Sequence, residues 1–92
     1  MSPRPKKKRC CEGKFCGHAF KPTGTPLQEL TTITLYRDEL EALRLCDLEG
    51  LFQQQAGERM GVSRGTIQRI LTRARKKTAQ ALVTGAALVF SD

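Results

Sequence analysis

The chain has 92 residues with 16 lysines and arginines against nine aspartates and glutamates, which gives a formal net charge of +7. This length suits one small domain with a modest stability margin. No apolar run approaches the ~20 residues that a membrane span requires, and no apolar stretch follows the basic start, so we expect neither a membrane span nor a secretory signal. A cytoplasmic location follows as an expectation.

The charge is unevenly distributed along the chain. One basic cluster lies near the start and comprises Arg4, Lys6, Lys7, Lys8 and Arg9. A second cluster comprises Arg64, Arg69, Arg73, Arg75, Lys76 and Lys77. Between the two clusters, the stretch from Asp38 to Glu58 holds six of the nine acidic residues. This distribution favours an anionic partner, and double-stranded DNA is the first candidate. The alternative is a solubilising tail and a solvated helix face.

Residues 1–30 are expected to form a basic, cysteine-containing arm followed by a loop, and residues 31–92 the folded domain. Residues 1–9 carry almost no apolar side chains and should be flexible in solution, and such an arm can follow phosphates or enter a minor groove. The next residues group four side chains that bind soft metals: Cys10, Cys11, Cys16 and His18. They could hold zinc or another metal, and the alternative is a reactive cysteine cluster without metal.

The segment 19–30 should be a loop because it has two prolines and a glycine within five residues. Phe20 and Leu27 are the residues that could anchor this loop on the core. The β-branched residues 31–35 could form a short strand. A helix over about 38–49 should follow, with Asp38 as its N-cap and Gly50 at its end.

The apolar residues of this helix do not form one stripe at 100° per residue, so it should be buried on several sides. Cys46 is expected to be a small core residue in it rather than a metal ligand.

The stretch 53–77 has the spacing of a helix-turn-helix unit. The first helix covers residues 53–60, with Gly57 where the two helices cross most closely. Gly61 occupies the turn, where a left-handed backbone suits glycine, and Ser63 caps a second helix over 63–83. Gly85 should end this helix.

The second helix divides into two faces. Ile67, Ile70, Leu71 and Ala74 point to the core. The opposite face carries Gly65, Gln68, Arg69, Thr72, Arg73 and Lys76. These residues, together with Arg64, Thr66 and Lys77, are expected to contact DNA. In this motif the start of the second helix meets base edges in the major groove, so Arg64, Gln68 and Arg69 are the candidates for reading bases. The later cations should meet phosphates.

Residues 86–90 form a final apolar run, too short for a helix of its own. They could be a strand that pairs with 31–35 or a contact between two copies of the chain. The predicted fold class is all-α: three helices over 38–49, 53–60 and 63–83, with short strands only at 31–35 and 86–90.

The stretches DELEALRL and MGVSRGT, together with the Pro-Arg-Pro-Lys start and the FKPTGTP segment, resemble the UPF0251 (DUF134) family of small bacterial and archaeal proteins. The resemblance covers nearly the whole chain and implies a DNA-binding helix-turn-helix domain like region 4 of sigma factors. Arg64, Thr66 and Arg69 match the family's recognition-helix pattern. Gly57 stands where the family usually has alanine and Tyr36 where it often has threonine, which leaves the helix cap to Asp38.

We therefore expect a sequence-specific DNA-binding regulator of transcription that forms a homodimer. One alternative is a metal- or redox-responsive regulator that uses the cysteine and histidine cluster. Another is an adaptor that contacts RNA polymerase. An enzyme is not expected, because no nucleophile–base pair, phosphate loop or carboxylate pair occurs at a meaningful spacing.

Overall fold

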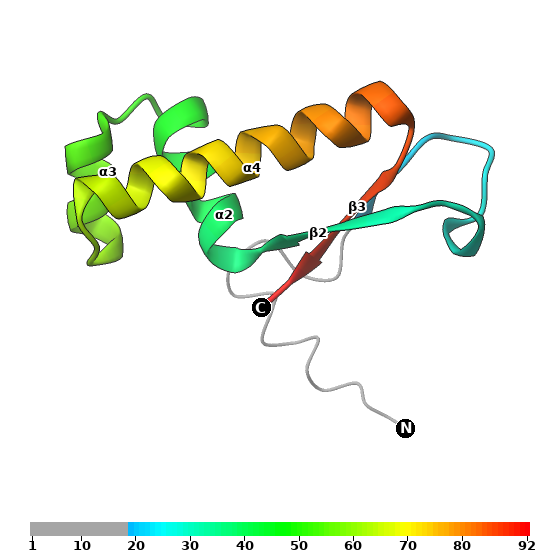
Figure 1. Ribbon diagram of the computed structural model, residues 1–92, viewed down its shortest axis with the longest axis horizontal. Coiled ribbons are helices and arrows are strands. Elements are labelled where there is room, and N and C mark those ends of the chain that lie inside the picture. The colour runs from blue at the N-terminus through cyan, green and yellow to red at the C-terminus, as the bar shows by residue number, and fades with distance from the viewer. Residues whose placement is uncertain (1–18) are drawn as a thin grey trace.

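The computed structural model of the chain describes residues 19–92. It is mostly helical and contains a small three-stranded sheet (Figure 1). The elements in order are β1 (Ala19–Phe20), η1 (Leu27–Glu29), β2 (Thr32–Tyr36), α2 (Arg37–Ala42), η2 (Leu43–Leu48), α3 (Gln53–Met60), α4 (Arg64–Thr84) and β3 (Ala87–Ser91). The expected fold class, all-α, is wrong in one respect: the strands pair into a sheet that belongs to the fold.

The sheet has the strand order β1-β3-β2. β3 runs antiparallel to β1 and parallel to β2, with Ile33 opposite Leu88. The predicted pairing of the two apolar segments is thus confirmed. Parallel neighbours need a long connection, and here the connection contains every helix from α2 to α4. β3 is the middle strand, so its backbone pairs within the chain on both sides.

The helix predicted over 38–49 begins at Arg37 and directly continues β2 (Figure 1). Its N-cap is Tyr36, not Asp38, and the backbone N–H of Tyr36 donates to Glu39 Oε1 at 2.9 Å. The expected cap was wrong because the end of the strand fixes where the helix starts, and no turn remains in which Asp38 could act as a cap.

The second half of this helix, η2, is a π-helix. Its wider turns do not advance by the 100° per residue assumed for an α-helix, which explains why the apolar residues there gave no clean stripe. Leu45 is buried and Leu48 is 79% exposed. Cys46 is half-buried and packs against the core, and burial raises the pKa of its thiol. Gly50 ends the segment with φ +82°.

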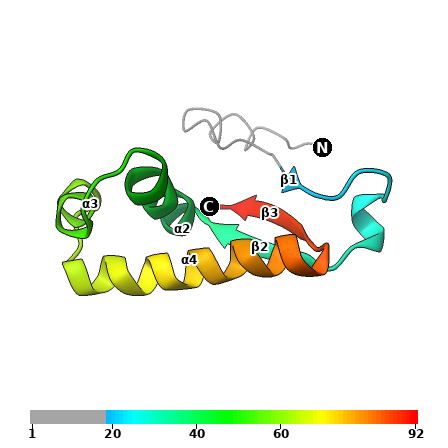
Figure 2. The same cartoon turned by 90° about the horizontal axis from the view of Figure 1, so that it is seen from above.

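The core gathers around the first half of α4. Ala42, Leu45, Ala56, Ile67, Ile70 and Leu71 form one buried cluster. The second half of α4 lies against β2 and β3 instead, where Ala81, Ala86, Ala87 and Leu35 are buried (Figure 2). α4 therefore joins a helical half of the domain to a sheet half. The expected core side of α4 is confirmed at Ile67, Ile70, Leu71 and Ala74.

Neither apolar residue of the predicted loop is anchored on the core. Phe20 is 67% exposed and Leu27 is 37% exposed. Phe20 belongs to β1, where its ring centroid lies 6.0 Å from that of Phe90 on β3. It is held by its strand partner at the edge of the sheet rather than by the helices.

The turn between α3 and α4 depends on two glycines. Gly61 has φ +74° and carries the backbone through a left-handed conformation that few other residues adopt without strain. The N–H of Val62 then donates to the carbonyl of Gly57 at 2.9 Å. A Cβ on Gly57 would lie 2.7 Å from the carbonyl oxygen of Val62. The predicted close approach at Gly57 is therefore confirmed.

Gly57→Val is expected to lower the free energy of unfolding by about 1–3 kcal/mol, because the added side chain forces the turn away from α3. Urea denaturation measures this loss. Gly65→Val is the matched control, since a Cβ on Gly65 would have its nearest neighbour at 3.8 Å and lies on an exposed surface. An equal loss in both variants would contradict the close approach at Gly57.

Candidate nucleic-acid interface

α4 carries six basic and no acidic residues along its 21 positions. The buried residues Ile67, Ile70, Leu71 and Ala74 lie on one side of α4 and fix its rotation about its own axis. The residues on the other side therefore face outward. Gly65, Gln68, Arg69, Thr72, Arg73 and Lys76 are exposed, as predicted for the outward face. The helix is about 32 Å long at 1.5 Å per residue, and these residues occupy its first two-thirds.

The start of α4 is organised by three hydrogen-bonded side chains. Ser63 Oγ accepts from the backbone N–H of Thr66 at 3.1 Å, which confirms Ser63 as the cap. Ser63 Oγ also donates to Thr66 Oγ1 at 3.0 Å, and Arg69 Nη2 donates to the same Thr66 oxygen at 3.3 Å. Arg69 is thereby held along the helix surface beside the turn.

Of the predicted DNA-contacting residues of α4, three have polar side chains with no partner within residues 19–92, namely Arg64, Gln68 and Lys76. Their polar groups face solvent. Thr72 is different, because its hydroxyl donates to the Gln68 carbonyl at 2.8 Å within the helix. The free groups are a guanidinium, an amide and an ammonium, which between them can contact phosphates and base edges.

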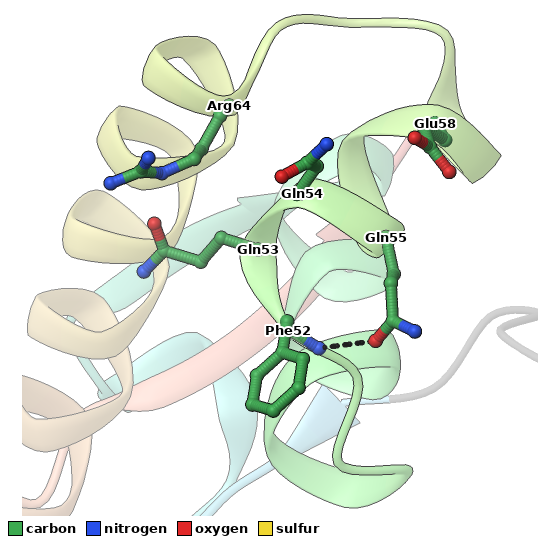
Figure 3. A pocket seen from close by; sticks show the side chains of 6 residues that line it. All are labelled: Phe52, Gln53, Gln54, Gln55, Glu58 and Arg64. Atoms are coloured by element: carbon green, nitrogen blue, oxygen red, sulfur yellow. Dashed lines mark hydrogen bonds between the residues drawn. The ribbon is translucent and has the colours of Figure 1, made fainter.

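A shallow pocket adjoins Arg64 at the start of α3. It is lined by Phe52, Gln53, Gln54, Gln55, Glu58 and Arg64. Figure 3 shows the side chains of Gln53 and Arg64 extending toward the same side, whereas Gln55 and Glu58 lie on the other side of α3. Gln55 is occupied locally, since its Oε1 accepts from the backbone N–H of Phe52 at 2.9 Å. The pocket thus extends the polar surface of α4 onto α3.

Glu39 is the one buried charged residue of residues 19–92, with 1% exposure. Its Oε1 accepts from Lys77 Nζ at 2.7 Å and from the N–H of Tyr36, and its Oε2 accepts from Arg73 Nε at 3.3 Å. Lys77 Nζ also donates to the carbonyl of Thr34 at 2.8 Å. Glu39 therefore connects β2, α2 and α4 through one carboxylate.

Burial alone raises the pKa of Glu39, but the hydrogen bonds from Lys77, Tyr36 and Arg73 outweigh it, and the pKa lies below its ordinary value. The carboxylate is therefore charged at neutral pH. Lys77 is only 25% exposed and its ammonium lies 4.7 Å from the centre of the Tyr36 ring. Two predicted DNA-contacting residues of α4, Lys77 and Arg73, are thus engaged by Glu39, and Lys77 is the more buried of the two.

Sequence reasoning missed Glu39. One signal was present: Glu39, Ala42 and Leu45 follow one another at intervals of three, and both apolar members are buried. That spacing places Glu39 on the buried face of its helix. A charged residue on such a face needs cationic partners, and α4 supplies two of them.

A second ion pair joins η2 to α4. Arg75 Nε and Nη2 donate to the two oxygens of Asp47 at 3.0 and 2.7 Å. These hydrogen bonds from Arg75 lower the pKa of Asp47. Both side chains are about half exposed, so this pair contributes less stability than the buried one.

Several sequence predictions fall outside the described residues. They are the basic arm, Arg4, Lys6, Lys7, Lys8 and Arg9, and the suggested metal ligands, Cys10, Cys11, Cys16 and His18. Within residues 19–92 no three potential ligands of a metal ion come together, and no helix of this part is long and apolar enough to span a membrane. The suggested metal site stays a prediction from sequence.

The geometry defines a small, mostly helical domain with a three-stranded sheet and a long basic helix whose outer face is open. The chain belongs to the family described as "Protein of unknown function DUF134", whose model matches residues 1–92. The resemblance noted from the sequence is confirmed. No solved structure matches the chain.

Curated relatives carry the name UPF0251 protein. One from Vibrio parahaemolyticus is 51% identical over 97% of this chain and 93% of its own length. One from Aeromonas salmonicida is 48% identical over 95% of this chain and 85% of its own length. One from Desulforudis audaxviator is 62% identical over 75% of this chain, but the match spans only 45% of that longer protein.

Glu39→Gln is expected to lower the free energy of unfolding by about 1–3 kcal/mol at pH 7, because Lys77 and Arg73 lose their anionic partner. The pKa of Glu39 is depressed in the folded chain. The contribution of the Glu39 carboxylate to the free energy of unfolding is therefore complete above the ordinary glutamate pKa, about 4.3. It is lost as the pH falls through the lower pKa that Glu39 has in the folded chain.

Urea denaturation between pH 7 and pH 3 tests this dependence. The difference between wild type and Glu39→Gln should shrink toward low pH. Asp47→Asn removes an exposed paired carboxylate and serves as the control, with a smaller effect at pH 7. A Glu39→Gln difference that stays constant across this range would refute the role of the charged carboxylate.

Proposed function

We propose that the protein binds double-stranded DNA through a helix-turn-helix unit made of α3, the turn and α4, and that it regulates transcription. The observation that carries this proposal is the outer face of α4. It presents cations and amides without acidic residues, at the rotation expected for a helix lying in the major groove.

Local geometry supports a division of roles along α4. Arg64, Gln68 and Arg69 lie at its start, next to the turn, where this motif contacts base edges. Arg69 is braced by Thr66, which limits the entropy that an arginine loses on binding. Arg73 and Lys76 lie further along and suit phosphates. Lys77 suits them less, since it is held by Glu39 and Thr34.

α3 supplies a second contact with DNA, through Gln53. Gln53 and Arg64 extend to the same side at the shallow pocket (Figure 3). In this motif the first helix crosses the DNA backbone while the second enters the groove. Gln53 is then placed to donate to a phosphate of the strand beside Arg64. The homodimer, the contact with RNA polymerase and the control by metal stay predictions from sequence.

Titration of the full chain with a library of genomic duplex fragments tests DNA binding. The affinity should fall as salt rises, and each neutralised phosphate should contribute about −0.9 to the slope of log K against log salt. Arg69→Ala should cost about 1–3 kcal/mol of binding free energy and relax the preference at one base position.

Arg59→Ala is the matched control, because Arg59 is an exposed arginine of α3 that lies outside the proposed face. It should leave the base preference unchanged. DNA binding that does not respond to salt, or an equal loss of base preference in both variants, would count against the proposal.

A further inference from the structure

Arg73 has an unusual pair of neighbours: solvent on one side and a buried carboxylate on the other. Its side chain is 55% exposed, whereas the side chain of its partner Glu39 is 2% exposed. Only its Nε takes part in the contact, at 3.3 Å from Glu39 Oε2. Its two Nη groups have no recorded partner within residues 19–92.

We propose that Glu39 is a positioning residue for DNA binding. From its buried position it holds the guanidinium of Arg73, so that the two Nη groups can donate to a backbone phosphate of DNA where α2 packs against α4. This inference rests on the proposed function and adds to it the residue that orients one phosphate contact. Two Nη groups held in one plane can donate to two phosphate oxygens at once.

The charge balance of the cluster supports this role. Lys77 lies closest to Glu39, at 2.7 Å, and is mostly buried with it. One ammonium is enough to neutralise one carboxylate, so the positive charge of Arg73 is left in surplus. Glu39 can therefore orient Arg73 without cancelling its attraction for a phosphate.

Arg75 shows the contrasting arrangement on the same helix. Its side chain is 53% exposed, nearly the same as that of Arg73. Its Nε and Nη2 both donate to Asp47, which pairs with no other cation within the described part of the chain, residues 19–92. Arg75 is therefore neutralised in place, and it provides a control of equal charge and equal exposure.

A double-mutant cycle on the full chain tests the proposal, with dissociation constants for duplex DNA measured at one salt concentration. Arg73→Ala should weaken binding about tenfold and Arg75→Ala less than about threefold, a tenfold change being about 1.4 kcal/mol. Glu39→Gln should weaken binding about threefold, although it removes a negative charge and simple electrostatics would strengthen binding. In the Arg73→Ala background, Glu39→Gln should cause no further loss.

Two outcomes would overturn the inference while leaving DNA binding intact. One is tighter or unchanged binding by Glu39→Gln. The other is the same loss from Glu39→Gln with and without Arg73, which would mean that Glu39 acts only through the fold. A wild-type chain that does not bind duplex DNA would instead refute the proposed function itself.

A further variant keeps the test decisive if circular dichroism shows that Glu39→Gln does not fold. Arg73→Lys retains the positive charge. The lysine ammonium lacks the planar guanidinium, so it cannot donate one N–H to Glu39 and at the same time present two coplanar N–H groups to a phosphate. It should bind nearly as weakly as Arg73→Ala. Binding by Arg73→Lys at the wild-type level would show that charge alone is used, and the inference would fail.

Discussion

The carboxylate of Glu39 is the interaction on which this small fold most depends. A buried charge is costly unless its partners compensate for lost water. Here three donors come from two elements: the Tyr36 N–H lies at the end of β2, and Lys77 and Arg73 belong to α4. The carboxylate itself belongs to a third element, α2. Because β2 runs straight into α2, this one contact sets both the start of the helix and its position against α4.

The same cluster closes one edge of the sheet. The carbonyl of Thr31 accepts from the N–H of Ala87, so the backbone groups of Thr31 point toward β3. The backbone groups of successive residues in a strand point to alternate sides. Those of Thr34 and Tyr36, three and five residues further on, therefore point away from β3, to the outer edge of β2. Lys77 occupies the Thr34 carbonyl there, and Glu39 occupies the N–H of Tyr36. An unprotected edge strand invites pairing with other chains. Charged side chains from α2 and α4 therefore protect β2 and help to keep the sheet at three strands.

Local signals explain what could be predicted from the sequence. Gly57, Gly61 and Ser63 fix a turn within seven residues, and the structure confirms α3, the turn and the buried stripe of α4. The expectations that were wrong concern contacts between distant segments. The cap at Asp38 ignored the strand that precedes it, and Phe20 packs on Phe90, 70 residues away. Glu39 was missed because its partners lie 34 and 38 positions further along the chain. The DNA-contacting roles of α4 stay predictions.

The cations of α4 are not equivalent, and this changes what its charge means for binding. Glu39 and Asp47 each neutralise one of the six, so about four positive charges remain for a partner rather than six. Lys77 and Arg75 hold the helix in place, whereas Arg64 and Lys76 have no partner among the residues that the structure describes. Arg73 stands between the two groups, bound to Glu39 and still half exposed. In the proposed function, α4 is both scaffold and binding surface, because acidic residues from α2 and η2 pair with some of its cations and leave the others available.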